Sequence, residues 1–313
     1  MAKKLSVIIP FFNEQECIER IYDELKAVRA SRLAHYAFEI IFMDNHSTDD
    51  SYAIVEKICA KDPECQVFRL SRNFGFQANV LTGYLNSTGD AAIQLDADGE
   101  DDPQIIANFV DLWEQGYQVV YGVRKTRAEG FLLTLQRKVF YRILNSISDF
   151  PIPLDAGDFR LIDRKVVKAL GEFKEANPYI RGLISYAGFK QIGFSYDRRP
   201  RYKGVSKFTW LDYVNLAWTG ITSFSSKPLE IATWIGLTFA GLSFLGTLFY
   251  LGLYLAGKIP VRGFTTLVLI QLFIAGVQLL CIGLLGKYLG FIFKEVKDRP
   301  LSIVEKSIPE KSE

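Results

Sequence analysis

Five carboxylates lie within residues 96–103, directly after the apolar run 91–95. Like charges this close repel one another, so the fold alone does not favour them. Side chains at positions i and i+2 of an extended chain point the same way, so Asp96 and Asp98 present two hard oxygen donors together. Such a pair suits Mg²⁺ or Mn²⁺, because Mg²⁺ commonly binds one or two carboxylates together with substrate phosphate oxygens. The other three acids are Glu100, Asp101 and Asp102.

A solvated acidic loop that caps a helix is the plain alternative for this stretch. Asp102 fits that role, because carboxylates favour helix N-termini and the following Pro103 favours the first helical position. Asp101 has no evident task in either interpretation. For Asp96 and Asp98, which follow the apolar run directly, the metal interpretation is the stronger one.

Polar residues also follow three other short apolar runs. Residues 10–14, 44–49 and 71–75 come after the runs 5–9, 38–43 and 66–70, and a further run covers 118–121. Helical patterns lie between the runs, around 14–30, 48–61, 76–87 and 103–115. This alternation predicts an α/β fold with a mostly parallel sheet and helices on both faces. Since ligands bind beyond the carboxyl ends of such strands, we expect the polar groups to converge at one edge.

Two of these strand ends carry residues suited to a nucleotide. The aromatic residues before Asn13 and Glu14 can hold a base while the amide and carboxylate reach its ring edges, although a plain βα turn explains them equally well. After the second run, Ser47 or Thr48 is a natural helix N-cap. Asp44 precedes that cap and is available to a ligand.

The composition excludes several classes of protein. The 313 residues include 37 Lys and Arg and 35 Asp and Glu, so a net charge of +2 argues against a basic coat for nucleic acid. Four cysteines without CxxC spacing and two histidines argue against a zinc site or a disulfide framework. The N-terminal apolar run is too short for a signal peptide. We therefore expect the N-terminal part to stay in the cytosol.

Two long runs near the C-terminus contain no charged residue. They cover 231–257 and 263–286, and each can cross a hydrocarbon core of roughly 30 Å as a helix. The short loop 258–262 joins them, so we expect a membrane hairpin with both chain ends on one side. Lysines and an arginine flank its open end and favour the cytoplasm there. The expected organisation is a domain at 1–225, two membrane helices within 226–293 (about 231–257 and 263–290) and a cytoplasmic tail at 294–313.

Amphipathic and basic segments precede the hairpin. Residues 131–147 combine aromatic and aliphatic residues with basic ones, and residues 207–226 combine aromatic residues with few charges. Both patterns are typical of interfacial helices, although packing on the sheet is the alternative. Cations that could bind a lipid phosphate lie ahead of the first membrane helix, where simple flanking charge is the other interpretation. They are Arg198, Arg199, Arg201, Lys203 and Lys207, and Arg124 is a further candidate.

The order of these motifs resembles glycosyltransferase family 2 with the GT-A fold. The motifs are the turn at 10–14, Asp44 with 47–49, the segment 70–75, and the pair Asp96 and Asp98. With the segments 155–161 and 204–208 and two membrane helices added, the whole chain resembles bacterial polyprenyl-phosphate glycosyltransferases of the GtrB and dolichol-phosphate-mannose-synthase type. Glu100 stands where relatives usually carry Gln, and Asn45-His46 replaces the commoner Asp-Gly.

The resemblance implies a UDP-sugar donor, a polyprenyl phosphate acceptor and Mg²⁺ or Mn²⁺. The metal ligands it implies are Asp96, Asp98 and Glu100, with Asp98 also catalytic. Asp158 lies where the family's proposed base is found, and it serves to position a substrate or to remove a proton. The binding residues expected on this basis are Pro10, Phe12, Asn13, Glu14, Asp44, Arg72, Asp96, Arg124, Arg201, Ser206 and Lys207. A single displacement at the anomeric carbon by the acceptor phosphate would invert its configuration.

The resemblance favours glucose as the sugar and undecaprenyl phosphate as the acceptor. It also implies a homo-oligomer, a tetramer, in the inner membrane with the catalytic domain in the cytoplasm. A processive polysaccharide synthase is the first alternative, but the sequence lacks the Gln-X-X-Arg-Trp motif and further membrane spans. A membrane scaffold with an inactive domain is the second, and the intact Asp96 and Asp98 pair argues against it.

Overall fold

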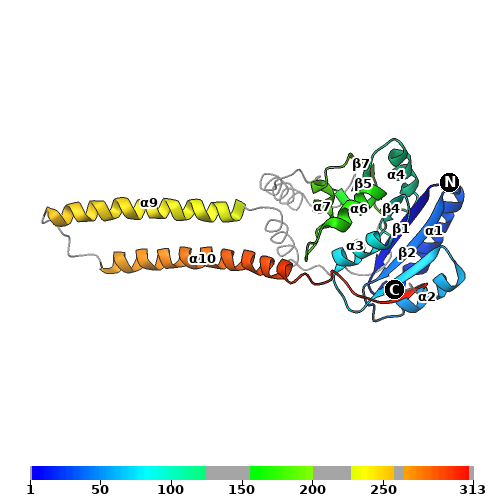
Figure 1. The fold of residues 1–313 in the computed structure, drawn as a ribbon, viewed down its shortest axis with the longest axis horizontal. Helices are drawn as coiled ribbons and strands as arrows, with labels where there is room; N and C mark the ends of the chain where they lie inside the picture. The colour runs from blue at the N-terminus through cyan, green and yellow to red at the C-terminus, as the bar shows by residue number, and fades with distance from the viewer. Residues whose placement is uncertain (1, 125–155, 200–226, 257–263, 310–313) are drawn as a thin grey trace. The chain divides into compact units, whose positions relative to one another are not determined.

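The computed structural model describes residues 2–124, 156–199, 227–256 and 264–309 (Figure 1). The chain divides into two compact units. Within the described ranges, the first unit comprises 2–124, 156–199 and 298–309, and the second comprises 227–256 and 264–297. Residues of the C-terminal tail therefore belong to the same unit as the N-terminal domain.

The first unit is built on one eight-stranded sheet with the order β7-β5-β6-β4-β1-β2-β3-β8. The strands are β1 Lys4–Phe11, β2 Ala37–Asp44, β3 Cys65–Leu70, β4 Ala91–Gln94, β5 Val119–Arg124, β6 Ala156–Asp163, β7 Gln191–Tyr196 and β8 Val304–Ile308. The helices are α1 Ile18–Arg32, α2 Ser51–Lys61, α3 Phe76–Asn86, α4 Ile105–Glu114, α6 Arg164–Glu172 and α7 Ile180–Tyr186. The five strands and four helices predicted up to residue 124 are confirmed.

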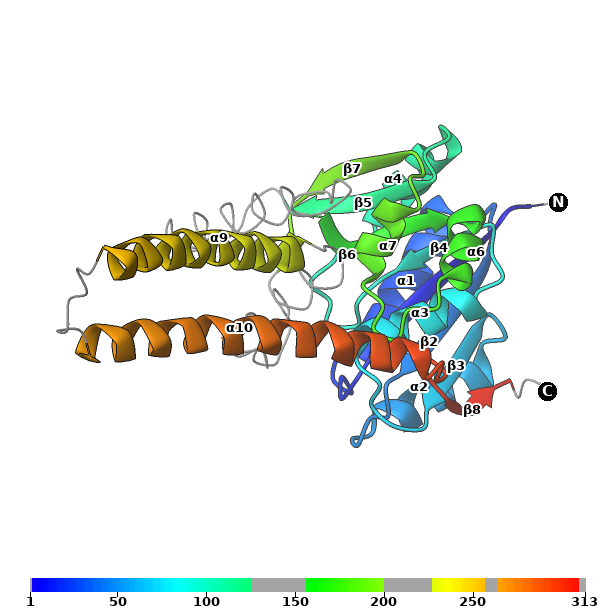
Figure 2. The same cartoon turned by 60° about the vertical axis from the view of Figure 1, so that its left-hand side comes forward.

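The strands are apolar on both sides, which explains why helices cover both faces of the sheet (Figure 2). In β2, Ile40 and Phe42 pack in one core with α1, α2 and α4, while Ile41 and Met43 pack in the other with α3, α6 and α7. Successive side chains of a strand point to opposite faces, so a run that is apolar throughout must be covered twice. The predicted α/β layers are therefore confirmed.

Strand direction decides which residues share an edge. β1 runs parallel to β2 and β4, β2 runs parallel to β3, and β5 runs parallel to β7. β6 is antiparallel to both β4 and β5, and β8 is antiparallel to β3. Six strands thus end at one edge of the sheet, called here the carboxyl edge, where β6 and β8 begin. The opposite edge is called the amino edge.

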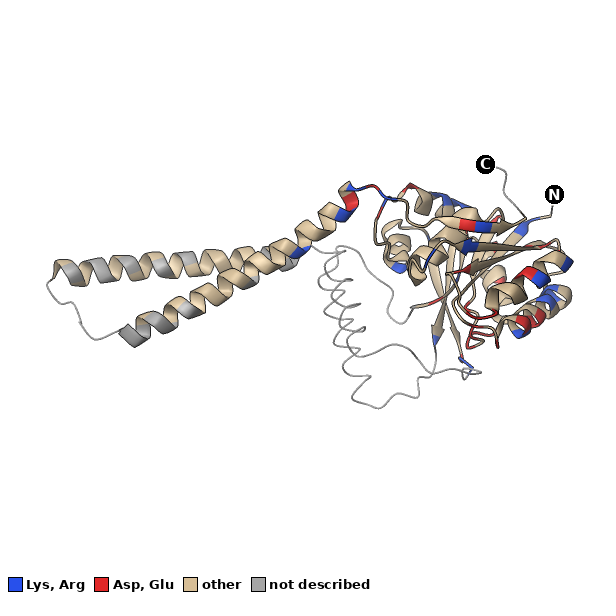
Figure 3. Cartoon of the chain, turned by 90° about the horizontal axis from the view of Figure 1, so that it is seen from below, with Lys and Arg blue, Asp and Glu red and all other residues tan. Residues whose placement is uncertain are grey.

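The second unit contains two long helices, α9 Lys227–Leu255 and α10 Phe264–Val296, of 29 and 33 residues. They lie side by side, with the rings of Phe239 and Phe273 5.7 Å apart (Figures 1 and 2). Few charges interrupt either helix until the end of α10 (Figure 3). By length and composition, 273–296 could cross a membrane, and 232–246 is a shorter apolar helix. Both predicted uncharged runs are therefore helical in their described parts.

Some predicted features lie outside the described residues. These are the segments 131–147 and 207–226 and the acceptor candidates Arg201, Ser206 and Lys207. Three strands, β6, β7 and β8, had no counterpart among the predicted runs.

Candidate active site

The predicted polar residues do converge at the carboxyl edge. Asp44 is the last residue of β2, Asp96 is the second residue after β4, and Arg124 is the last residue of β5. Asp158 lies near the start of β6, which runs in the opposite direction and so begins at this same edge. The sheet therefore gathers groups that are far apart in the sequence.

Two turns of the carboxyl edge are tied together by hydrogen bonds. The backbone N–H of Asn13 donates to Ser47 Oγ (3.0 Å), and that of Thr48 donates to Asn13 Oδ1 (2.8 Å). Glu14 N–H donates to Ser51 Oγ (2.9 Å). Asn13 has φ +56°, a left-handed conformation that Asn tolerates better than most residues. Of the residues expected to bind nucleotide, Asn13 thus shapes the turn over Asp44, while Pro10 is the seventh residue of β1.

Asp44 is fully buried, yet only part of its carboxylate is satisfied. Oδ1 accepts a hydrogen bond from Ser47 N–H (2.7 Å), whereas Oδ2 has no hydrogen-bond partner among the described residues. Burial raises the pKa of Asp44, and the bonds from Ser47 and the charge of Arg69 offset only part of this effect. A buried acceptor without a partner is costly. Asp44 Oδ2 is therefore positioned to accept a hydrogen bond from a ligand.

Arginines at the end of β7 compensate three acids of the stretch 96–103. Arg198 forms an ion pair with Glu100 and lies 3.3 Å, through Nε, from Asp101 Oδ1. Arg199 contacts Asp102 Oδ2 at 2.6 Å and donates its backbone N–H to Glu100 O (2.9 Å). Opposite charges at these distances offset the repulsion that the sequence raises. Arg198 and Arg199, which were candidates for binding a lipid phosphate, thus hold the acidic loop.

Asp101 and Asp102 have structural tasks. Asp101 is only 1% exposed and also accepts a hydrogen bond from the hydroxyl of Tyr196, the last residue of β7. Asp102 Oδ1 accepts from Gln104 N–H (2.9 Å), so it caps the turn that leads into α4 as predicted. Glu100 is already paired with Arg198, which offsets the negative charge that it would offer to a metal ion.

Asp96 and Asp98 are the two acids of the stretch for which these arginine contacts supply no structural role. Burial raises the pKa of Asp96 well above its usual value, and the charges of Asp101, Asp158 and Asp98 add to that effect. Asp98 is 9% exposed, and its Oδ1 accepts Glu100 N–H at 3.1 Å. Among the described residues, no three Asp, Glu, His or Cys side chains gather as a metal site. A divalent ion held by two carboxylates and completed by phosphate and water oxygens fits this donor set.

Asp158 is held by an arginine that the sequence analysis did not single out. Arg181 of α7 donates from Nε to Asp158 Oδ1 (2.8 Å) and from its Nη2 to Oδ2 (2.5 Å). Burial alone would raise the pKa of Asp158, but the charges of Arg181, Arg160 and Arg124 outweigh it and lower the pKa. A bidentate ion pair of this kind keeps the Asp158 carboxylate charged and fixes its orientation. The arrangement favours positioning over proton removal for Asp158.

Two predicted arginines lie at the edge in different surroundings. Arg72 is exposed after β3, and its guanidinium lies 3.8 Å from the centroid of the Phe74 ring. Arg124 is partly buried, and its Nε has no hydrogen-bond partner within the described ranges. Phe12 and Glu14 are partly buried in the turn after β1.

The model of the family described as glycosyl transferase family 2 matches residues 6–171, which include most of β1, the strands β2 to β6 and the acids of the carboxyl edge. The chain belongs to glycosyltransferase family 2. The resemblance expected from the motifs is thereby confirmed, and the chain is a glycosyltransferase.

Relatives within the family match over nearly the whole chain. The glycosyltransferase YkcC of Bacillus subtilis, itself uncharacterised, is 39% identical over 303 residues, which cover 96% of this chain and 93% of the relative. The SfII prophage-derived bactoprenol glucosyl transferase of Shigella flexneri is 37% identical over 306 residues, covering 97% and 98%.

A solved structure confirms the fold. The mannosyltransferase PcManGT from Pyrobaculum calidifontis, in complex with GDP-Man and Mn²⁺, matches with a TM-score of 0.50 at 15% identity. The match covers 95% of this chain and 86% of that one. At this identity the likeness concerns the fold alone, and it agrees with the GT-A architecture of the family.

Proposed function

We propose that this glycosyltransferase transfers glucose from UDP-glucose to a polyprenyl phosphate, undecaprenyl phosphate, at the cytoplasmic face of the inner membrane. The observation that carries the proposal is the carboxyl-edge site, where Asp44, Asp96, Asp98 and Asp158 meet in a chain similar throughout to bactoprenol glucosyl transferases.

The nucleotide end of the donor would lie at β1 and β2. Asp44 Oδ2 is buried and lacks a hydrogen-bond partner among the described residues, so it can accept a hydrogen bond from the nucleoside. Pro10, Phe12, Asn13 and Glu14 shape the neighbouring turn, and Arg72 at the end of β3 adds a cation for the donor.

Asp96 and Asp98 would hold Mg²⁺ or Mn²⁺ with the donor diphosphate. The bound ion supplies stabilisation of the negative charge that builds up on the leaving diphosphate. Because Arg198 already offsets the charge of Glu100, Asp96 and Asp98 are the main protein ligands in this proposal. The raised pKa of Asp96 reflects burial and negative charge nearby, which a cation would relieve.

The acceptor phosphate would bind to Arg124 and to the predicted residues Arg201, Ser206 and Lys207. A phosphate monoester has a second pKa near 6, so it is largely dianionic at about pH 7 and needs little help from a base. Asp158, which forms a bidentate ion pair with Arg181, would instead orient the reacting groups. Direct displacement at the anomeric carbon inverts the configuration.

The path of the chain supports a membrane hairpin with both ends on one side. β8 follows α10 and pairs with β3, so the segments before α9 and after α10 contribute to one domain. A chain that leaves this domain and returns to it crosses a membrane an even number of times. Together with the uncharged runs 231–257 and 263–286, this favours two crossings and cytoplasmic ends. The proposal also includes a homo-oligomer, a tetramer.

The full-length protein in lipid nanodiscs tests the proposal. Radiolabelled UDP-glucose, UDP-galactose and UDP-N-acetylglucosamine are offered with undecaprenyl phosphate and Mg²⁺ or Mn²⁺, and the labelled lipid is measured. We expect label from UDP-glucose, loss of transfer with EDTA, and an inverted anomeric centre in the product. Label from no nucleotide-sugar, or transfer that withstands EDTA, would contradict the proposal or its metal.

A further inference from the structure

The C-terminal strand β8 brings one carboxylate to the nucleotide end of the site. β8 pairs with β3 so that Lys306 lies opposite Arg69, whereas Val304 lies opposite Leu70. Glu305 is therefore an extra residue at a shift in register. Irregularities of this kind redirect a side chain and are frequent beside active sites. The strand thus presents Glu305 at the carboxyl edge rather than in the ordinary pairing.

Several contacts hold the chain that leads into β8. Ser71 N–H donates to Ile303 O (2.9 Å), and the hydroxyls of Thr82 and Ser302 are 2.6 Å apart. Leu301 packs against the core that contains α3. The position of Glu305 therefore depends on an ordered connection to β3 and α3 and not on a free tail.

Arg69 lies between Glu305 and Asp44. Its Nε is 3.7 Å from Asp44 Oδ2 and 3.7 Å from Glu305 Oε2, which are both beyond hydrogen-bonding distance. The Nε is buried and has no hydrogen-bond partner among the described residues, as is also true of Asp44 Oδ2. The guanidinium is supported elsewhere, by Ser47 O at 3.3 Å and by the ring of Tyr52 at 4.8 Å.

From this geometry we infer that Glu305 is a positioning residue for the donor nucleotide. It attracts Arg69 away from Asp44 and so keeps Asp44 Oδ2 available to the nucleoside. Without the charge of Glu305, Asp44 is the one carboxylate of the described residues within 4.0 Å of the Arg69 guanidinium, and a short shift would form the missing hydrogen bond. That bond would occupy the acceptor that the nucleotide needs. The inference rests on the proposed role of Asp44 in nucleotide binding.

Glu305→Gln tests the inference, because it keeps the shape of the side chain and removes only its charge. Lys306→Gln is the matched control, an exposed neighbour on the same strand. Dissociation constants of UDP with Mn²⁺ are measured by calorimetry on the full-length protein, together with its melting temperature. Because the side chain of Glu305 is exposed (44%) and solvent screens its charge, we expect Glu305→Gln to weaken UDP binding only about threefold, with an unchanged melting temperature. Lys306→Gln should bind UDP as the unchanged protein does.

A double-mutant cycle separates positioning through Arg69 from a general effect of the tail. If Glu305 acts through Arg69, Glu305→Gln should have no further effect on UDP binding in an Arg69→Gln background. Equal affinity of Glu305→Gln and the unchanged protein would overturn the inference, as would independent effects of the two substitutions.

The same measurements distinguish this inference from the proposed function. A panel of UDP, GDP, CDP and ADP is first titrated into the unchanged protein. If none binds, the nucleotide-sugar donor is wrong and the inference about Glu305 falls with it. If UDP binds and Glu305→Gln does not weaken it, only the inference falls.

Discussion

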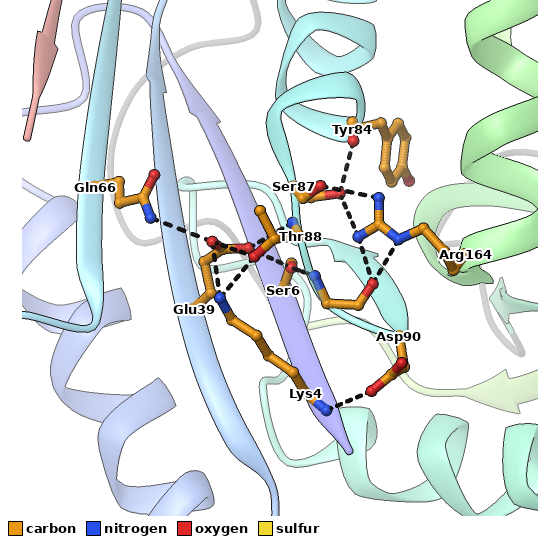
Figure 4. A network of polar contacts seen from close by, with 10 residues as sticks. Lys4, Ser6, Glu39, Gln66, Tyr84, Ser87, Thr88, Asp90 and Arg164 are labelled. Carbon is orange, nitrogen blue, oxygen red and sulfur yellow. Dashed lines mark hydrogen bonds and ion pairs between the residues drawn. The ribbon is translucent and has the colours of Figure 1, made fainter. Parts of the chain in front are cut away.

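Strand β2 carries a buried carboxylate near each end, and the two differ in how far their hydrogen bonds are satisfied. Glu39 lies near the amino edge and is 2% exposed, while Asp44 ends the strand at the carboxyl edge and is 0% exposed. Glu39 accepts from Ser6 Oγ (2.5 Å), Thr88 N–H (2.9 Å), Thr88 Oγ1 (2.8 Å), Lys4 Nζ (3.1 Å) and Gln66 Nε2 (3.2 Å) (Figure 4). Asp44 accepts one hydrogen bond, from Ser47 N–H, among those of the described residues.

The neighbours of Glu39 form a closed network at the amino edge (Figure 4). Arg164 donates to Gly89 O (2.6 Å) and to Ser87 O (2.9 Å), and Gly89 N–H donates to Ser6 Oγ. A Cβ at Gly89 would lie 2.7 Å from Ser6 Oγ and 2.8 Å from Lys4 O, so the close approach requires glycine. The network joins the starts of β1, β2 and β4 to the end of β6.

The difference separates stability from function within one sheet. A buried carboxylate with its hydrogen bonds made stabilises the folded chain, whereas one left incomplete raises its energy until a ligand binds. Asp96 resembles Asp44 in this respect, because burial and neighbouring carboxylates also raise its pKa. Acids of the carboxyl edge should therefore matter for transfer, and those of the amino edge for folding.

The largest effect is expected for Asp98→Ala. Loss of a proposed metal ligand should reduce glucose transfer by at least about a hundredfold, because the charge on the leaving diphosphate is no longer offset. Transfer of label to undecaprenyl phosphate and the melting temperature are measured on the same preparation. The melting temperature should not fall, and Asp111→Ala on α4, which changes an exposed acid, should keep full activity. Full activity of Asp98→Ala would remove Asp98 from the metal site.

Glu39→Gln should have the opposite profile. The substitution keeps the size of the side chain but weakens charge-assisted hydrogen bonds in a buried place, so it should cost about 2 kcal/mol of folding stability. A fall in melting temperature with an unchanged KM for the donor is the expected result. Glu56→Gln, an exposed acid on α2, serves as the control. A raised KM with unchanged stability would show that the two edges are not separated as we argue.

Asp44→Asn should affect binding rather than folding. Replacing the free acceptor by an amide should weaken UDP binding about tenfold, the equivalent of about 1.4 kcal/mol. The melting temperature should stay the same or rise, because a buried charge without full compensation is removed. Calorimetry with UDP measures the first quantity, and Asp50→Asn at the exposed start of α2 is the control. Unchanged affinity for UDP would place the nucleoside elsewhere.

The sequence predicts the part of this fold that depends on local pattern. Apolar runs ended by polar turns mark β1 to β5, and parallel pairing then brings Asp44 and Asp96 to one edge. Arg124 reaches the same edge because β6 is antiparallel to both β4 and β5. β8 could not be predicted in this way, because Val304–Ile308 is short, polar and exposed for most of its length and is a strand only through its pairing with β3.

The ion pairs that offset the acidic stretch could not be predicted from the sequence either. The acidic stretch and Arg198 are separated by almost a hundred residues, and only the parallel pairing of β5 with β7 places the end of β7 beside it. The pattern alone suggested a metal ion for Asp96 and Asp98, a helix cap for Asp102 and no task for Asp101, whereas the chain supplies two arginines that pair with Glu100, Asp101 and Asp102. Arg181 was missed for the same reason, since its partner Asp158 comes from a different element.

The smallest effect, a pH dependence, is the sharpest comparison of Glu39 with Asp44. Burial raises the pKa of Glu39, but bonds from Ser6, Thr88 and Lys4 outweigh it and lower the pKa. Its contribution to stability is therefore present above the ordinary value of 4.5 and is lost as the pH falls below it. The pKa of Asp44 is raised, so its contribution is present below 3.8 and is lost as the pH rises.

Melting temperatures of the unchanged protein, Glu39→Gln and Asp44→Asn between pH 7 and pH 3 measure both slopes. As the pH falls, the stability advantage of the unchanged protein over Glu39→Gln should shrink. Over the same interval, the unchanged protein should gain stability relative to Asp44→Asn. Slopes of the same sign would mean that the hydrogen bonds at the two ends of β2 do not set the two carboxylates apart. Addition of UDP with Mn²⁺ should flatten only the Asp44 slope, because a donor on Oδ2 stabilises the charged carboxylate.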